Sequence, residues 1–114
     1  MNCIIVDENQ SAQKQLAEYI TQVPQFNLRA NCFSAYEALE VLQSQNIDLI
    51  FLDTQLSRIA GIDFAKNLIS SPMIIITSPS AQYAADAYNI DAVDYLIKPI
   101  GTVDLIHCIS VNIE

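Results

Sequence analysis

Basic side chains are scarce in this 114-residue sequence, which has five Lys and Arg residues against thirteen Asp and Glu residues. The basic residues are Lys14, Arg29, Arg58, Lys66 and Lys98, and they are scattered along the chain rather than gathered in a run. Because the formal net charge is −8, the chain should be repelled by polyphosphate. Direct binding of nucleic acid by these residues is therefore not expected.

Long apolar runs and a disulfide pattern are also missing. The apolar runs near Ile47 and Met73 are too short to span a bilayer, and the amino terminus lacks a basic-then-apolar signal segment. Cys3, Cys32 and Cys108 are odd in number and widely spaced in apolar sequence, which favours reduced core thiols over disulfides or a zinc site. We expect a soluble cytoplasmic protein with no membrane partner.

What the sequence does contain is enough apolar material for the packed core of one domain, at 52% hydrophobic and 16% charged residues. Apolar runs alternate with helical patterns from end to end, without repeats or a linker. The expected strands cover residues 3–6, 26–33, 48–52, 73–77 and 92–97. The expected helices include a stripe of Ala12, Leu16, Tyr19 and Val23, a helix opening at Ser34, and residues 62–69, 81–88 and 102 to about 113.

Strands that alternate with helices favour a parallel sheet covered on both faces. The run from 26 to 33 differs from the others because Asn27, Arg29 and Asn31 alternate with apolar residues, which is typical of an edge strand. We therefore predict an α/β fold, a flavodoxin-like (βα)5 doubly wound sheet with strand order 2-1-3-4-5. In this order the functional crevice lies at the carboxyl ends of strands 1 and 3.

The spacing of residues within the expected helices predicts which side chains cap a helix and which are buried. Ser34 and Glu37 have the spacing of a capping box. The helix that they open is expected to bury Ala35, Ala38, Leu39 and Leu42, and the helical tyrosines Tyr19, Tyr36, Tyr83 and Tyr88 are expected to pack.

Acidic residues follow two strands that should be neighbours. Asp7 and Glu8 come after the first strand and Asp53 after the third, so three carboxylates should converge at one crevice. Their mutual repulsion favours a bound cation, and an all-oxygen site suits Mg²⁺. The alternative, that Asp7 and Glu8 are ordinary solvated loop acids, is disfavoured by the topology.

Thr77 and Lys98 should lie on the same edge of the sheet. The fourth strand ends at Thr77, and the fifth is followed by Lys98 and Pro99. A lysine at the end of a buried strand must reach water or meet negative charge. We expect Lys98 to point its ammonium at the acidic crevice while Pro99 turns the chain.

Together the segments "IIVDE", "IFLD", "GIDFAKNL", "IIITS" and "DYLIKP" resemble the receiver domain of two-component response regulators. The run "AQYAADAYNIDAVDYLIKPI" is most similar to receivers that precede a LytTR-type DNA-binding domain. The resemblance implies one receiver domain over residues 1–114. It also implies that DNA binding and transcription regulation belong to a C-terminal output domain that is not present in this chain.

The resemblance also implies the role of each site residue. Asp53 would be the phosphoacceptor, taking a phosphoryl group from a sensor histidine kinase to form an aspartyl phosphate. Mg²⁺ would be held by Asp7, Glu8, Asp53 and the backbone carbonyl of Gln55, and Lys98 and Thr77 would contact phosphoryl oxygens. Such a protein is not an enzyme acting on a separate substrate, although it takes part in its own phosphotransfer and autodephosphorylation.

Thr77 and Tyr95 are implied to act as a coupled switch that favours a homodimer after activation. The output face would be built from the fourth helix, the fifth strand and the last helix, and would carry Tyr83, Asp86, Tyr88, Asp94, Asp104 and His107. The alternative for Tyr95 is simple packing of a strand aromatic.

The chain departs from the family pattern in the loop after Asp53. Ser57 stands where the family usually has proline, which should loosen this loop, whereas Gly61 is retained. A dehalogenase-type phosphatase is disfavoured because Gln55 stands where such an enzyme has its second aspartate. A flavodoxin-like electron carrier is disfavoured because the acidic loop "DENQSAQ" lacks the Gly/Ser/Thr-rich sequence that would hold the phosphate of FMN. A degenerate receiver that acts only as a protein-interaction module is the main alternative hypothesis.

Overall fold

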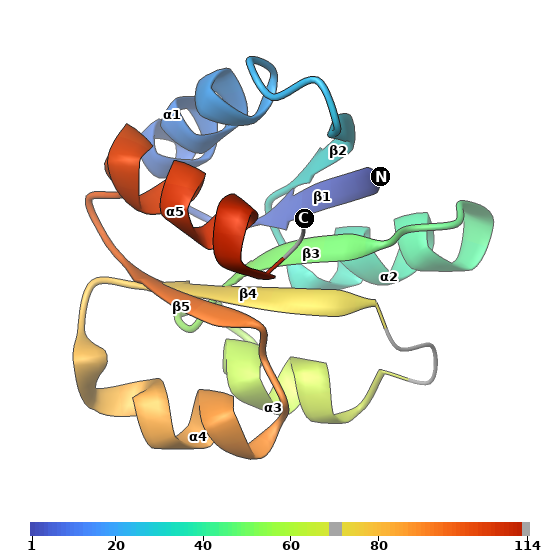
Figure 1. Ribbon diagram of the computed structural model, residues 1–114. Helices are drawn as coiled ribbons and strands as arrows, with labels where there is room; N and C mark the ends of the chain where they lie inside the picture. The colour runs from blue at the N-terminus through green and yellow to red at the C-terminus, as the bar shows by residue number, and fades with distance from the viewer. Residues whose placement is uncertain (69–71, 113–114) are drawn as a thin grey trace.

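The computed structural model describes residues 1–68 and 72–112, within which five parallel strands form one sheet of order β2-β1-β3-β4-β5 (Figure 1). The strands are β1 (Asn2–Val6), β2 (Asn27–Cys32), β3 (Leu49–Asp53), β4 (Met73–Ser78) and β5 (Asp94–Ile97). The helices are α1 (Gln10–Ile20), α2 (Ala35–Ser44), α3 (Gly61–Lys66), the 3₁₀-helix η1 (Ala81–Tyr83), α4 (Ala84–Asn89) and α5 (Thr102–Asn112). The predicted fold class and strand order are confirmed.

The observed element boundaries differ from the sequence prediction by a few residues. β3 includes Asp53 as its last residue, β5 begins only at Asp94, and the expected fourth helix is divided into η1 and α4. Ile69 and Ile113, where two predicted helices were expected to end, lie outside the described residues. None of these shifts moves a strand to a different place in the sheet.

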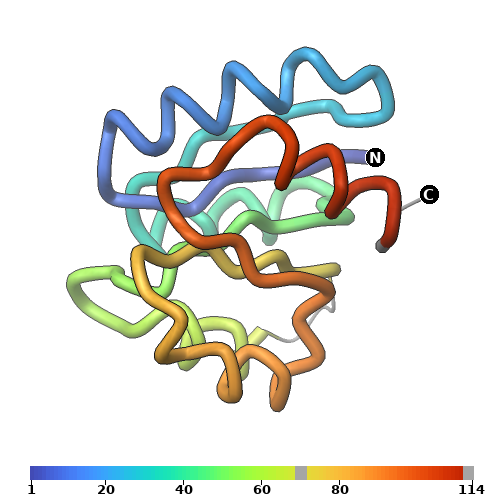
Figure 2. The backbone as a smooth tube through the Cα atoms, turned by 60° about the vertical axis from the view of Figure 1, so that its left-hand side comes forward, coloured from blue at the N-terminus to red at the C-terminus, as the bar shows by residue number. Residues whose placement is uncertain are grey.

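The helices cover the sheet in two layers, with α1 and α5 on one face and α2, α3 and α4 on the other (Figures 1 and 2). Successive residues of a strand point to opposite faces, so Leu49 and Phe51 pack toward α1 and α5, while Ile50 and Leu52 pack toward the other layer. All four side chains are fully buried. Burial on both faces explains why β3 is apolar without interruption.

β2 is an edge strand, as its alternating sequence predicts. Asn27, Arg29 and Asn31 are exposed, and their neighbours along the strand are at least partly buried. The outward Arg29 donates a hydrogen bond from Nε to Oε1 of Gln45 at 3.1 Å. β1 beside it is buried on both faces, which places the carboxyl end of β1 well inside the sheet.

The capping prediction for α2 is confirmed, but part of its buried stripe was predicted wrongly. The Ser34 hydroxyl accepts a hydrogen bond from the Glu37 N–H at 3.1 Å. Ala38 is fully buried, whereas Leu39 is 42% exposed. Leu39 follows Ala38 directly, and consecutive residues of a helix point in different directions, so Leu39 does not face the sheet. Tyr36 and Tyr88 are also exposed, so the expectation that they pack is wrong.

The loop after Asp53 returns so closely to β3 that it has no room for a side chain at Gly61. The Gly61 N–H donates to the Thr54 carbonyl at 3.0 Å. A Cβ on Gly61 would lie 1.9 Å from the carbonyl oxygen of Asp53, closer than atoms can approach without a shift. The retained glycine is therefore a steric requirement of the chain path next to the site.

We predict that Gly61→Ala lowers the free energy of unfolding by about 1–3 kcal/mol, because the added methyl group meets backbone that cannot rotate away. Urea denaturation measures this change. Gly101→Ala is the matched control, since its Cβ would meet only the flexible Asp104 Oδ2, at 3.3 Å. The control should keep or slightly raise the free energy of unfolding, and equal losses in both variants would contradict the steric explanation.

Candidate functional site

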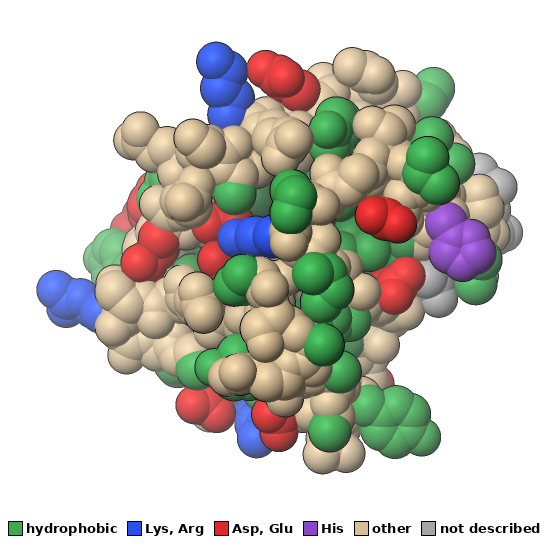
Figure 3. All heavy atoms as spheres, turned by 90° about the vertical axis from the view of Figure 1, so that its left-hand side faces the viewer, with side chains coloured by type: hydrophobic (Ala, Val, Ile, Leu, Met, Phe, Trp, Pro, Cys, Tyr) green, Lys and Arg blue, Asp and Glu red, His purple; other side chains and the backbone are tan. Residues whose placement is uncertain are grey.

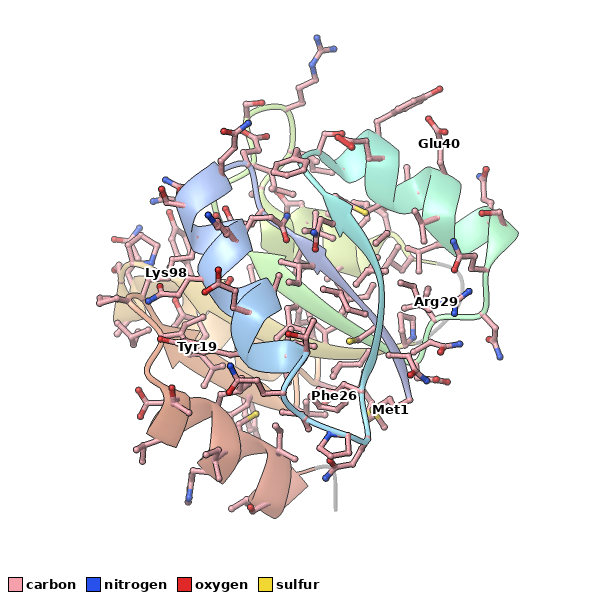
Figure 4. All side chains as sticks on the ribbon, turned by 90° about the horizontal axis from the view of Figure 1, so that it is seen from above. Met1, Tyr19, Phe26, Arg29, Glu40 and Lys98 are labelled. Atoms are coloured by element: carbon pink, nitrogen blue, oxygen red, sulfur yellow. The ribbon has the colours of Figure 1, made fainter. Side chains whose placement is uncertain are left out.

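Four of the residues singled out from the sequence meet at the carboxyl edge of the sheet. Asp53 ends β3 and lies in register with Thr77 on β4, Asp7 follows β1, and Lys98 follows β5. Figure 3 views this edge and shows a basic side chain in a hollow between acidic ones. In Figure 4, Lys98 lies at the opposite end of the sheet from Met1.

Lys98 joins the two aspartates. Its ammonium donates to Asp7 Oδ2 at 2.6 Å and to Asp53 Oδ2 at 3.1 Å. The side chains of Asp7 and Asp53 are only 4% and 6% exposed, and that of Lys98 is 18% exposed. The ammonium therefore lies where the sequence predicts, inside the acidic crevice, and offsets the repulsion of two buried carboxylates. The bond between Lys98 and Pro99, which follows, is cis.

The second oxygen of each aspartate is held by backbone two residues farther along the chain. Asp7 Oδ1 accepts from the Asn9 N–H at 2.9 Å, and Asp53 Oδ1 accepts from the Gln55 N–H at 3.1 Å. Both are the local turn that aspartate makes readily with its own backbone. Each carboxylate is thus held in place by one backbone donor and by the shared ammonium.

Burial raises the pKa of Asp53 above its ordinary value. The negative charge of Asp7 acts in the same direction, whereas the Gln55 N–H and the Lys98 ammonium lower the pKa and offset part of the rise. Asp53 is therefore a carboxylate that has lost much of its hydration and has not been fully compensated by its partners. Such a group gains from further positive charge.

Glu8 does not join the two aspartates. Its Oε2 accepts from the Ser57 N–H at 2.6 Å and from the Ser57 hydroxyl at 2.9 Å. Across residues 1–68 and 72–112, no three His, Cys, Asp or Glu side chains are arranged to hold a metal ion. The expected convergence of three carboxylates is thus replaced by a pair of aspartates, and the Gln55 N–H donates to one of them, Asp53.

The donor atoms of the pair nevertheless fit Mg²⁺. This ion takes oxygen ligands and usually binds through one or two carboxylates, with water completing its shell. Asp7 and Asp53 supply two closely placed buried carboxylates that share a single ammonium, and burial, together with the charge of Asp7, raises the pKa of Asp53. These two residues would hold the ion, and ligation by Glu8 and by the Gln55 carbonyl remains a prediction.

A buried polar network below the site was not predicted from the sequence. Thr54 donates from its hydroxyl to Ser78 Oγ at 2.9 Å, and the Ser80 N–H donates to the same Ser78 oxygen at 3.3 Å. The Tyr95 hydroxyl in turn donates to the Ser80 carbonyl. The residue after Asp53 is thereby connected to Tyr95 through the loop after β4. Ser78 ends the segment "IIITS" and Thr54 directly follows "IFLD", but neither segment indicates that the two hydroxyls pair.

Gln13 is a second residue that sequence analysis missed. It is 2% exposed, and its Nε2 donates to the carbonyls of Asp7 at 3.2 Å and Cys32 at 2.9 Å. Its Oε1 is buried and has no hydrogen-bond partner among the described residues. Gln13 therefore connects α1 to the ends of β1 and β2 and supports the backbone that carries Asp7.

The sequence is similar to a known protein family and to curated proteins of that family. Residues 3–110 match the model of the response regulator receiver domain. The chain is 34% identical over 102 residues to the sensory transduction protein LytT of Enterococcus faecalis, covering 87% of this chain and 42% of the relative. It is also 34% identical to LytR of Staphylococcus haemolyticus, covering 87% and 40%. The chain thus spans about two fifths of the length of these relatives.

Solved structures show the same fold. The response regulatory domain of protein mrkE from Klebsiella pneumoniae superposes with a TM-score of 0.89 at 26% identity, covering 98% of this chain and 94% of that one. The response regulator domain of Thermotoga maritima CheB has a TM-score of 0.85 at 20% identity, covering 98% and 95%. Among the described residues, no helix has the length and apolar character needed to cross a membrane.

We predict that Asp53→Asn raises the free energy of unfolding near neutral pH. The folded pKa of Asp53 lies above its unfolded value of about 4. Its ionised form therefore costs stability, and this cost grows as the pH rises from the unfolded pKa through the folded one. The gain in the variant should shrink as the pH is lowered toward about 4.

Urea denaturation across this pH range measures the effect. Glu40→Gln is the control, because it removes one exposed carboxylate far from the site and should leave the free energy of unfolding nearly constant. A loss of stability in Asp53→Asn near neutral pH would show that Lys98 and Gln55 outweigh the cost of burial.

Proposed function

The chain belongs to the response regulator receiver domain family, and from this premise we propose that Asp53 accepts a phosphoryl group from a sensor histidine kinase. The observation that carries the proposal is the environment of Asp53: a buried carboxylate at the end of β3, held by the Gln55 N–H and the Lys98 ammonium. Thr77 lies beside it in register on β4. This arrangement supplies a nucleophile and two groups suited to contact a phosphoryl group.

In the proposed reaction, a carboxylate oxygen of Asp53 bonds to phosphorus as the bond from phosphorus to the histidine nitrogen breaks. The nitrogen keeps the electron pair, and the product is an aspartyl phosphate. Lys98 would shift from the carboxylates to one phosphoryl oxygen, and the Thr77 hydroxyl would contact another. Catalysis of this kind depends on positioning and on neutralising charge, and Mg²⁺ bound by Asp7 and Asp53 would supply the remaining positive charge.

The raised pKa of Asp53 supports its role as the nucleophile, because a poorly hydrated carboxylate attacks more readily than a solvated one. Water attacking the same phosphorus atom would break its bond to Asp53, release inorganic phosphate and return the carboxylate, so the chain would take part in its own phosphorylation and dephosphorylation. The three cysteines are buried thiols, which supports the expected reducing, cytoplasmic location.

We predict one phosphoryl adduct on the protein after incubation with Mg²⁺ and acetyl phosphate, a small phosphodonor. Intact-mass spectrometry measures it. Asp53→Asn should abolish the adduct, and Asp63→Asn, which removes an exposed carboxylate on α3, should retain it. An unchanged mass in the wild type would favour the degenerate, interaction-only alternative, and an adduct that persists in Asp53→Asn would overturn Asp53 as the acceptor.

For the output step, we propose that phosphorylation acts through Thr77 and Tyr95 on the face built from α4, β5 and α5. Tyr95 is hydrogen-bonded to Ser80, so a movement of the loop after β4 would alter its position. The hollow beside it is lined by Asp94, Tyr95, Leu96, Ile97, Val103, Asp104 and His107. Figure 3 shows the single histidine with acidic and hydrophobic side chains nearby.

Exposed apolar side chains on this face would supply the contacts of the proposed homodimer. Tyr88 and Val103 are 81% and 79% exposed, and Ile97 and Ile106 are also exposed. Because the chain spans only part of the length of its relatives, we propose that residues 1–114 form a receiver domain whose dimer would pair C-terminal DNA-binding domains. The population of dimer would rise because phosphorylated Asp53 favours one of two arrangements.

We predict that beryllofluoride, a phosphoryl mimic, increases self-association, as measured by sedimentation velocity. Thr77→Ala should reduce the increase, and Val103→Asp should abolish it by placing a charge in the apolar contact. Thr21→Ala on the far end of α1 and Leu39→Asp on exposed α2 are the controls and should behave like wild type. Equal self-association with and without the mimic would remove this face as the output while leaving Asp53 as the acceptor.

A further inference from the structure

Ser57 and Glu8 connect two loops at the edge of the site. Glu8 lies in the loop after β1, and Ser57 lies in the loop between β3 and α3. The two residues are joined by hydrogen bonds of 2.6 Å, from the Ser57 N–H, and 2.9 Å, from its hydroxyl, both to Glu8 Oε2. We call this pair of bonds the Ser57–Glu8 clasp.

The clasp depends on the residue by which this chain departs from its family pattern. Proline has no N–H and no hydroxyl, so the residue usual at this position could make neither bond. Serine supplies both donors to a carboxylate, and hydrogen bonds to an ionised acceptor are short and strong. Instead of simply loosening the loop, as the sequence predicts, the replacement provides a new connection to the end of β1.

The clasp also determines what Glu8 can do. Asp7, the residue before it, points its carboxylate at Lys98 together with Asp53. The Glu8 carboxylate is engaged by Ser57, and among the described residues it forms no metal-binding group with the two aspartates. A glutamate that completed a cation site with Asp7 and Asp53 would first have to release Ser57.

We propose that Ser57 is a positioning residue that competes with a divalent cation for the Glu8 carboxylate. The inference rests on the proposed function, since it concerns Mg²⁺ at Asp7 and Asp53. The clasp holds Glu8 away from the aspartates and fixes the loop after Asp53. When Glu8 turns toward the cation, the two donors of Ser57 are released and the loop between β3 and α3 loses its connection to β1.

The competition lowers the affinity for the cation, because two charge-assisted hydrogen bonds are given up on binding. It also couples metal occupancy to the surface next to the site. Glu8 and Ser57 line a groove of about 620 Å³ together with Leu56, Arg58 and Ile59 on one side and residues 33–36 on the other. Opening the clasp would change the wall of this groove.

Mg²⁺ titration by isothermal calorimetry tests the competition. We expect Ser57→Ala, which removes one donor, to bind Mg²⁺ about threefold more tightly than wild type, and Ser57→Pro, which removes both, about tenfold more tightly. In a Glu8→Ala background the same substitutions at Ser57 should have no effect. Ser44→Ala is the control, because its hydroxyl bonds only to carbonyls within α2.

Hydrogen exchange of the Ser57 amide gives a second readout that does not require phosphorylation. Exchange should be slow in the metal-free wild type, fast in Glu8→Ala, and faster in the wild type after saturation with Mg²⁺. Wild-type binding of Mg²⁺ with no gain in Ser57→Ala or Ser57→Pro would overturn the competition and leave the role of Asp53 intact. Failure of every variant to bind Mg²⁺ would overturn both the competition and the proposed metal site.

Discussion

The contact of one lysine with two buried aspartates is the constraint on which the site depends. Asp7 and Asp53 are nearly inaccessible to water, and two like charges at such a place would be costly without Lys98 between them. The pKa of Asp53 remains raised even so, because burial outweighs the help from Lys98 and Gln55. Two carboxylates face one ammonium at this edge of the sheet, so a divalent cation would offset the negative charge that Lys98 leaves uncompensated.

The sheet supplies the geometry for this contact. Parallel strands in the order β2-β1-β3-β4-β5 bring the ends of β1 and β3 together, and β4 and β5 extend the same edge. Local turns then fix one oxygen of each aspartate, and the close return of the chain at Gly61 determines the path of the loop after Asp53. The Thr54–Ser78–Ser80 network connects that loop with Tyr95, so the site and the face of α4, β5 and α5 share a continuous set of contacts.

Sequence reasoning identified the residues whose position follows from strand order. Asp7, Asp53, Thr77 and Lys98 end or follow buried strands, and the carboxyl ends of neighbouring parallel strands must meet. It missed Gln13 and the pairing of Thr54 with Ser78, because the role of a polar residue inside a protein is indicated only by its partners, which come from distant parts of the chain. It also misplaced the exposed Leu39 and Tyr88, since the rotation of a short helix depends on what it packs against.

The sequence by itself determined the alternation of strands and helices, the edge character of β2 and the set of charged groups at the carboxyl edge, because periodicity is a local pattern and the connections between parallel strands follow general rules. Only the tertiary structure decided how those charges pair. Glu8 follows Asp7 directly, yet its carboxylate is engaged by Ser57, 49 residues away, while that of Asp7 is engaged by Lys98, 91 residues away. Adjacent side chains in a loop point in different directions, and the donors that they meet are brought there by packing of the whole sheet.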